Sequence, residues 1–288
     1  MINRILTSLD SNNKSESYAV IMQLVDWSQA YDRQCPRLII QSFIDNGVRR
    51  SLIPLLISYF QNRKMHVKWK GKLSSEKKLP GGGPQGVPLG QYSYISQSNS
   101  NSSFVPEENR FKWIDDLTIL EVINLISIGL ASYNFKQHVA SDIGIDQKYL
   151  INKKTKSQQY MNEICKWTDS QKMKLNEEKS KVMIVNLSKK YQFSTRIMMN
   201  ESMLEIVNET KVLGLIITPN LGWRKNTDSI VSKANKRMFI IRNLCQFPIP
   251  TKELVTLYGQ FIRTMLEFNS NVWFSSITEE ESEDLERV

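Results

Sequence analysis

The chain has 288 residues, 41% hydrophobic and 23% charged, a composition typical of a folded globular protein and not of a disordered one. It carries 38 Lys and Arg against 29 Asp and Glu, and six of those acids follow Thr278. Residues 1–278 therefore hold 37 bases against 23 acids. This excess favours a polyanionic partner, such as nucleic acid or an anionic membrane surface.

Several classes of protein do not fit the sequence. The longest apolar stretches, 52–60 and 122–131, fall well short of the ~20 residues of a membrane span. Residues 1–16 lack the apolar core and cleavage site of a signal peptide. The three cysteines are far apart and accompanied by only two histidines, so no structural zinc site is expected. Sparse cysteines suit a reducing compartment, and we expect an intracellular protein, nuclear or cytoplasmic, without a membrane partner.

The first elements are predicted from apolar runs and turn signals. Residues 19–27 form a short apolar run that predicts a buried strand. A helix is expected to begin at Pro36 and to end at Asn46-Gly47, and a second helix is expected over 49–61. The alternation of apolar and basic residues in 65–73 predicts a half-exposed strand.

Residues 80–90 are rich in glycine and predict a loop whose backbone can adopt unusual conformations. Residues 111–120 are apolar on both sides of two adjacent acids, and we interpret them as a hairpin with Asp115 and Asp116 at its tip. A helical stretch is expected over 118–131.

The later segments continue the mixture of element types, after a Ser- and Asn-rich loop at 97–110. Helices are expected over 157–174, 226–246 and 251–270, and strands over 181–187, 193–199 and 212–218. The sequence therefore predicts an α+β fold with a helical C-terminal part.

Three aspartates, Asp26, Asp115 and Asp116, are embedded in apolar runs. Burial of an uncompensated charge is costly, so such acids usually have a partner or a metal ion. Carboxylates from two neighbouring strands can hold a pair of Mg²⁺ ions, which activate an attacking hydroxyl and stabilise the leaving oxygen in phosphoryl transfer. An Asp-Asp pair is also common in solvated turns, and Asp26 alone also fits a cap or a turn residue.

Five motifs around these residues occur in a fixed order: VDWSQAYD (25–32), GGGPQGVPLG (81–90), KWIDDLTIL (112–120), MKLNEEKSKVMI (173–184) and VLGLIIT (212–218). Their order and spacing resemble motifs A to E of reverse transcriptases, most closely those encoded by non-LTR (LINE-like) retroelements of animals. Each motif is weak alone, whereas PQG followed by an Asp-Asp hairpin and then LNxxKxK is specific. The match extends from about residue 20 to 220.

The resemblance implies an RNA-directed DNA polymerase, a nucleotidyltransferase from a retrotransposon. Its palm, an antiparallel sheet with packed helices and a remnant of the fingers, would occupy residues 1–220, and an incomplete helical thumb would occupy 221–288. Two Mg²⁺ ions, with Mn²⁺ as a substitute, would serve as cofactors. An RNA template, a DNA primer and dNTP would be the partners, while the oligomeric state is not indicated.

The resemblance also assigns roles to residues. Asp26 corresponds to the metal ligand of motif A, and Asp115 and Asp116 to the acidic pair of motif C. Together they would bind the two Mg²⁺ ions for attack of a primer 3′-hydroxyl on the α-phosphate of a dNTP. Tyr31 corresponds to the aromatic gate that excludes a 2′-hydroxyl, although an aromatic at this position also fits plain core packing. Asp32 is interpreted as a local cap or partner, not a metal ligand.

Other motif residues are assigned in the same way. Gln85 and Gly86 correspond to the loop that borders the incoming nucleotide and template base. Lys179 and Lys181 lie in motif D, where one would protonate the pyrophosphate; Lys179 is slightly favoured, and solvated surface charges are the alternative. Leu213-Gly214 lies in the motif E hairpin, which resembles a primer grip.

Basic residues accompany the motifs at two places. Phosphate contacts are independent of sequence, so clustered Lys and Arg suit a polymerase that moves along any template. The residues expected to contact nucleic acid are Lys68, Lys70, Lys233, Lys236 and Arg237. A solvated face is the competing interpretation of each.

The sequence departs from the family pattern at two points. Trp113-Ile114 stand where motif C usually has an aromatic residue followed by Ala or Val. Only about 25 residues precede Asp26, too few for the fingers of the family, so we expect an N-terminally truncated fragment with its fingers largely missing.

Two other functions stay open. An RNA-dependent RNA polymerase also uses an aspartate in motif A and an Asp-Asp pair in motif C, but Tyr31 and PQG argue against it. A decayed retroelement fragment would keep only the fold or nucleic-acid binding. The intact aspartates argue against complete decay, and the missing fingers argue for it.

Overall fold

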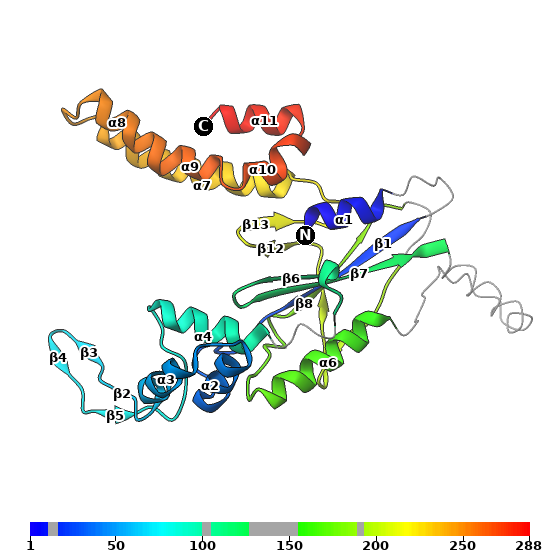
Figure 1. The fold of residues 1–288 in the computed structure, drawn as a ribbon. Coiled ribbons are helices and arrows are strands. Elements are labelled where there is room, and N and C mark those ends of the chain that lie inside the picture. Colours follow the sequence, from blue (N-terminus) through cyan, green and yellow to red (C-terminus); the bar gives the residue numbers. More distant parts are fainter. Residues whose placement is uncertain (11–16, 100–104, 127–154, 189–192) are drawn as a thin grey trace, which may run out of the picture.

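The computed structural model describes residues 1–10, 17–99, 105–126, 155–188 and 193–288 (Figure 1). The architecture is α+β, as the sequence predicts, with a central, mostly antiparallel sheet and helices packed on it. Within these ranges, no helix combines the length and the apolar character that crossing a bilayer requires.

The central sheet has the strand order β11–β8–β1–β7–β6. β1 (Tyr18–Val25) lies in the middle and pairs antiparallel with both β7 (Asp116–Asn124) and β8 (Lys181–Asn186). β6 (Arg110–Trp113) pairs antiparallel with β7, and β11 (Glu205–Ile206) pairs parallel with β8. The central strands are buried on both faces, which explains why they read as continuous apolar runs.

Alternate residues of β1 face opposite layers of the molecule. Ile21 packs in the cluster that contains Met161 of α6 (Lys156–Ser170). Met22 packs in the cluster that contains residues of α1 (Ile2–Leu9). The sheet is thus covered by α6 on one side and by α1 on the other (Figure 1).

The N-terminus of α6 is fixed to the sheet by Glu121 of β7. Its carboxylate accepts hydrogen bonds from the backbone N–H groups of Lys156 (3.0 Å) and Ser157 (2.7 Å). A carboxylate is favourable at this end of a helix, where N–H groups are unpaired and the dipole is positive.

A group of helices lies beside the sheet, formed by α2 (Pro36–Asp45), α3 (Ile53–Phe60) and α4 (Pro88–Asn99). A 3₁₀ turn, Arg50–Leu52, precedes α3. Between α3 and α4 the chain forms two small antiparallel pairs: β2 (Lys64–Met65) with β5 (Lys77–Lys78), and β3 (Lys68–Trp69) with β4 (Lys72–Leu73). Figure 1 shows this extension at the edge of the molecule.

The remaining elements are mainly C-terminal. They are a 3₁₀ turn Glu107–Asn109, β9 (Met198–Met199), β10 (Ser202–Met203), β12 (Thr210–Val212), β13 (Leu215–Ile217), α7 (Arg224–Leu244), α8 (Thr251–Tyr258), a π-helical segment Gly259–Arg263, α9 (Thr264–Leu266), α10 (Ser270–Trp273), a 3₁₀ turn Phe274–Ser276 and α11 (Glu279–Glu286). The helices from α7 onward form a separate layer, which joins the sheet through the β12–β13 hairpin (Figure 1).

Four sequence predictions are wrong in part. The strand expected over 212–218 is a hairpin, because Leu213-Gly214 form a turn with positive φ between β12 and β13. The helix expected over 118–131 is strand β7 up to Asn124, and 127–131 lie outside the described residues. The single strand expected over 65–73 is split, because Lys70-Gly71 form a turn with positive φ between β3 and β4. The strand expected over 193–199 is limited to Met198–Met199.

Candidate active site

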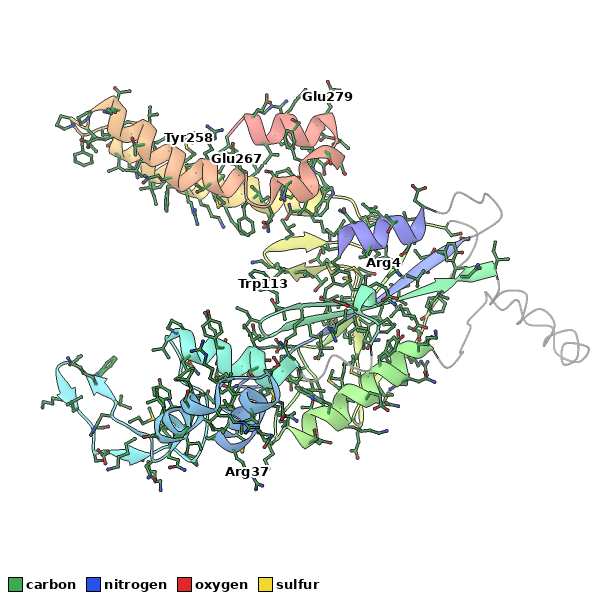
Figure 2. All side chains as sticks on the ribbon, in the orientation of Figure 1. Arg4, Arg37, Trp113, Tyr258, Glu267 and Glu279 are labelled. Carbon is green, nitrogen blue, oxygen red and sulfur yellow. The ribbon has the colours of Figure 1, made fainter. Side chains whose placement is uncertain are left out.

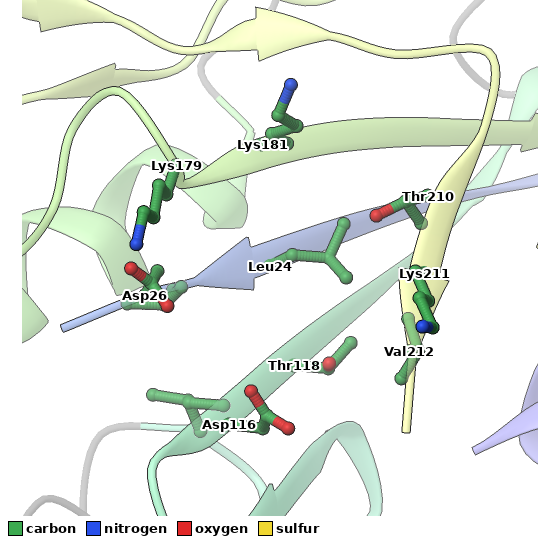
Figure 3. A pocket seen from close by; sticks show the side chains of 11 residues that line it. Leu24, Asp26, Asp116, Thr118, Lys179, Lys181, Thr210, Lys211 and Val212 are labelled. Atoms are coloured by element: carbon green, nitrogen blue, oxygen red, sulfur yellow. The ribbon is translucent and has the colours of Figure 1, made fainter. Parts of the chain in front are cut away.

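The strands that carry the three predicted carboxylates are neighbours in the sheet. The register pairs Val25 with Leu117 as its last step. One further step places Asp26 opposite Asp116, and directly opposed residues of antiparallel strands point to the same face. Both side chains line one pocket (Figure 3). Asp115 lies one residue earlier, in the β6–β7 turn.

The β6–β7 turn is tight and strained. Trp113 pairs with Asp116, so the turn consists of Ile114 and Asp115 alone. Ile114 has φ +54°, a left-handed conformation that is costly for a β-branched residue. Trp113 is 64% exposed and lies at the tip of the hairpin (Figure 2). The turn thereby presents Asp115 at the end of the sheet.

The carboxylates influence one another electrostatically. Burial raises the pKa of Asp26, and the charge of Asp115 adds to this, while Lys179 and a hydrogen bond with Asn176 oppose it. Burial also raises the pKa of Asp116, with further contributions from Asp115 and Asp26. Like charges thus accumulate at this end of the sheet, a repulsion that a cation would relieve.

The pocket shared by Asp26 and Asp116 has a volume of about 120 Å³ and is also lined by Lys179 and Lys181 (Figure 3). Lys181 is held in an ion pair with Glu205, with 2.7 Å between Nζ and Oε2. Lys179 is the lysine whose charge acts on Asp26. The two lysines of motif D are therefore distinguished by their partners.

The donor set fits a hard cation in its chemistry, because carboxylate oxygens are the ligands that Mg²⁺ prefers. Within the described ranges, however, no three His, Cys, Asp or Glu side chains are arranged closely enough to hold a metal ion. Asp26 and Asp116 share a pocket, and Asp115 does not line it. Metal binding by all three would need rotation of these side chains, and the two-metal site stays a prediction.

Motif D is bound directly to motif A. The hydroxyl of Ser180 accepts a hydrogen bond from the backbone N–H of Asp26 (3.0 Å), whose carbonyl accepts one from Asn176 (2.9 Å). Trp27 forms a bridge with Leu175. These contacts fix the backbone at Asp26 and hold Lys179 beside it.

A second pocket brings together the residues predicted to contact a nucleotide. Its volume is about 470 Å³. Tyr31, Pro84, Gln85, Gly86, Val87, Pro88 and Gln91 line it. Burial raises the pKa of Tyr31, and the charge of Asp115 raises it further. The second pocket therefore lies within electrostatic reach of Asp115.

The glycine-rich loop is held against motif A by its backbone. Gly83 donates to the carbonyl of Tyr31 (2.7 Å), and Gly82 donates to that of Gln34 (2.8 Å). Gln85 Nε2 donates to Asp32 Oδ1 at 2.8 Å. Asp32 is therefore a partner of the PQG glutamine, a contact that sequence reasoning missed because it joins residues far apart in the chain.

Tyr31 packs on Tyr94, with 5.2 Å between ring centroids. Tyr94 is fully buried, and its hydroxyl has no hydrogen-bond partner in the described part of the chain. Tyr31 thus touches the core and also lines the pocket, and its role as a gate stays a prediction. No motif in the sequence marked Tyr94, which reads as an ordinary helical aromatic.

The predicted nucleic-acid contacts lie on two separate elements. Lys68 and Lys70 are exposed on the β3–β4 pair, and Lys233 and Lys236 are exposed on α7. Arg237 is engaged inside the helical layer: its Nη1 donates to the carbonyl of Phe261 (2.9 Å), and its guanidinium lies 4.6 Å from the ring centroid. These contacts hold Arg237 against the Phe261 segment, and its contact with nucleic acid stays a prediction.

The predicted primer-grip residues occupy the turn between β12 and β13. Gly214 has φ +91°, which favours glycine, and a Cβ there would lie 2.8 Å from the Phe268 ring. The side-chain amide of Asn269 donates to the carbonyl of Leu213 (3.4 Å). The hairpin is thus joined to the C-terminal helices.

No protein-family model and no curated protein matches the sequence. Among solved structures, apo telomerase from Candida tropicalis, truncated from its C-terminal domain, is similar at 16% identity and a TM-score of 0.44, over 75% of this chain and 37% of that one. Telomerase from the same organism in complex with a TWJ fragment of telomeric RNA is similar at 14% identity and a TM-score of 0.43, over 99% of this chain and 44% of that one. The corresponding Candida albicans complex is similar at 11% identity and a TM-score of 0.37, over 96% of this chain and 43% of that one. The chain spans less than half the length of these telomerases.

Proposed function

We propose that the chain is the polymerase part of a reverse transcriptase from a non-LTR retroelement, with a palm in residues 1–220 and a thumb-like region in 221–288. The observation that carries the proposal is the juxtaposition of Asp26 and Asp116 in one pocket with Lys179. The pocket lined by Tyr31 and the PQG loop lies within electrostatic reach of Asp115. Nucleotidyl transfer needs acids that can bind metal ions, a positively charged side chain and a pocket for the nucleotide.

The proposed roles follow from these positions. Asp26, Asp115 and Asp116 would hold two Mg²⁺ ions, which supply charge stabilisation at the transferred phosphate. Lys179 would donate a proton to the leaving pyrophosphate, since Lys181 is engaged by Glu205. Tyr31 would close on the sugar, backed by the ring of Tyr94.

Primer extension with Mg²⁺ and dTTP on poly(rA)/oligo(dT) tests the proposal. We expect extension by the wild-type chain and a loss of at least about 100-fold in Asp115→Asn, because a metal ligand and its charge are removed. Asp45→Asn is the matched control, since Asp45 is an exposed aspartate of α2, and this variant should extend at the wild-type rate.

Other outcomes would support the alternatives. Equal activity in wild type and Asp115→Asn would overturn the site assignment. Efficient extension with rNTP would identify an RNA-dependent RNA polymerase. Binding of primer–template without any extension, in both Mg²⁺ and Mn²⁺, would identify a chain that keeps only nucleic-acid binding.

A further inference from the structure

The extension between α3 and α4, residues 64–78, is a two-part hairpin of defined geometry. Trp69 is paired with Lys72 and Lys68 with Leu73, and the turn between them is Lys70-Gly71, with φ values of +46° and +80°. The backbone N–H of Ser74 donates to the carbonyl of Val67 (2.9 Å), and the N–H of Val67 donates to the side-chain hydroxyl of Ser74 (2.9 Å). The hairpin therefore presents its side chains at fixed positions.

No core explains these side chains. Every residue from 64 to 78 is exposed. Trp69 is 72% exposed, the largest fraction of any large hydrophobic side chain in the described residues, and Leu73 is 66% exposed. Tryptophan is enriched among the residues that contribute most to binding, so Trp69 on this hairpin is a candidate contact residue.

The positive charge of the hairpin favours a polyanionic partner. Residues 64–78 contain six lysines and one acid, Glu76. Lys64 lies directly opposite Lys78, an arrangement of like charges that destabilises a strand pair. Glu76 pairs with Lys64 and leaves Lys78 without an acidic partner in the described part of the chain. A bound anion would relieve this repulsion.

The distribution of side chains favours nucleic acid over a membrane. Directly opposed residues share a face, so Trp69 lies beside Lys72 on one face, and Leu73 lies beside Lys68 on the other. A membrane-binding element separates an apolar face from a charged one, whereas both faces here are mixed. An aromatic ring with an adjacent lysine suits a base stacked on the ring and a phosphate beside it.

The base of the hairpin is joined to the nucleotide loop. Arg63 Nη1 donates to the carbonyl of Gly82 (2.8 Å), and the carbonyl of Arg63 accepts from Leu79 (2.8 Å). Gly82 belongs to the loop that continues to Gln85 and Gly86 of the second pocket. A strand held at the hairpin would therefore lie on an element fixed to that pocket.

We propose that residues 64–78 bind single-stranded nucleic acid, with one base stacked on Trp69 and the neighbouring phosphates contacted by Lys72 and Lys70. The site is separate from the three aspartates and does not depend on catalysis. Stacking needs an unpaired base, so a duplex would bind to the lysines alone.

Fluorescence anisotropy with labelled single-stranded oligo(dT) tests the proposal. We expect Trp69→Ala to weaken binding about tenfold, and Trp69→Phe to stay within about threefold of wild type, because stacking survives in phenylalanine. Phe247→Ala is the matched control, since Phe247 is an aromatic residue with 62% exposure outside the hairpin, and it should bind as the wild type does. Removal of an exposed side chain should leave the circular dichroism spectrum unchanged.

A site-specific signal makes the result independent of binding elsewhere on the chain. Protein labelled with 5-fluorotryptophan gives one ¹⁹F resonance for each of its six tryptophans. The resonance of Trp69 is assigned as the one that is missing from the spectrum of Trp69→Phe. We expect this resonance to shift with oligo(dT), and to shift equally in Asp115→Asn, which separates the hairpin from the catalytic proposal. An unchanged resonance at saturating oligo(dT) would overturn the proposal, as would a shift seen with phosphatidylserine vesicles but not with oligo(dT).

Discussion

Lys112 is a partly buried cation on β6, three residues before Asp115. Its Nζ donates to the hydroxyl of Ser98 and to Asn99 Oδ1 at 3.3 Å, which fastens β6 to the end of α4. Burial lowers the pKa of Lys112 to about 8, and the positive charge of Arg110 adds to the effect. At neutral pH the folded protein therefore carries a charge that its surroundings disfavour.

This lysine gives stability a dependence on pH. The folded pKa lies below the ordinary value of 10.5, so the unfolded chain binds more protons between pH 8 and 10.5. The free energy of unfolding should therefore rise with pH across that window. We expect the wild type to gain roughly 1–3 kcal/mol relative to Lys112→Met between pH 7.5 and 10.5, measured by urea unfolding.

Lys252→Met provides the control for that measurement, because it removes an exposed lysine of α8. Its difference from the wild type should be the same at both pH values. A parallel pH dependence of Lys112→Met and wild type would contradict the assignment.

Tyr31 gives a second prediction at this scale, one that rests on the proposed polymerase. Valine at this position would open the pocket on the side of Tyr31, so we expect Tyr31→Val to raise rNTP use relative to dNTP by roughly tenfold or more. Tyr92→Val, which changes an exposed tyrosine of α4, should leave the ratio of kcat/KM values unchanged. An unaltered ratio in Tyr31→Val would contradict the role of Tyr31 as a gate and leave only its packing on Tyr94.

Among the elements, α4 and the loop before it form a closely fitted unit. A Cβ at Gly90 would lie 1.7 Å from the carbonyl oxygen of Pro84, which is backbone and cannot rotate away. Pro84 and the neighbouring Gln85 line the second pocket. Glycine at position 90 therefore lets the first turn of α4 approach the loop.

Alanine at this position should disturb both stability and the pocket. We expect Gly90→Ala to lower the free energy of unfolding by roughly 1–3 kcal/mol, because the loop must move to admit the methyl group. Gly259→Ala is the matched change, since a Cβ at Gly259 meets no atom within 4 Å, and it should be neutral or slightly stabilising. Urea denaturation of the two variants measures the difference; equal stabilities would show that the loop adapts.

The elements also show what a sequence can and cannot predict. The buried strand predicted over 19–27, which the structure has at Tyr18–Val25, the helix beginning at Pro36 and the Asp115 hairpin are confirmed, because apolar runs, proline and paired acids give strong local signals. The run after Asp116 was predicted as a helix over 118–131. A mostly apolar run does not distinguish a helix from a strand, and the pairing of β7 with β1 and β6 decided this one.

The candidate site divides in the same way. The motifs single out Asp26, Tyr31 and Gln85 as candidate site residues, and the structure places Tyr31 and Gln85 in one pocket. The partners of these residues could not be predicted, because Tyr94 beneath Tyr31 and Asp32 beside Gln85 meet them only through tertiary packing.

At the scale of the whole molecule, the acidic C-terminal segment forms ion pairs with the basic helix α7. Arg224 at the start of α7 pairs with Glu280 (3.4 Å) and Asp284 (3.0 Å) of α11. α11 begins with a capping box between Thr278 and Glu281. The acidic segment thus forms an ordered helix on α7, and the charge excess of the preceding residues is partly neutralised at this end.

The central position of β1 has a consequence for synthesis of the chain. Its neighbours β7 and β8 end at Asn124 and Asn186, so one edge of β1 stays unpaired after β7 has been made, until β8 follows. Pairing of segments so distant in sequence is slow, and apolar strands with open edges associate readily with other chains. The nascent protein should therefore depend on chaperones until β8 emerges from the ribosome, and Asp26 should reach its final surroundings only after Asn176 and Ser180, which bond its backbone, have been made.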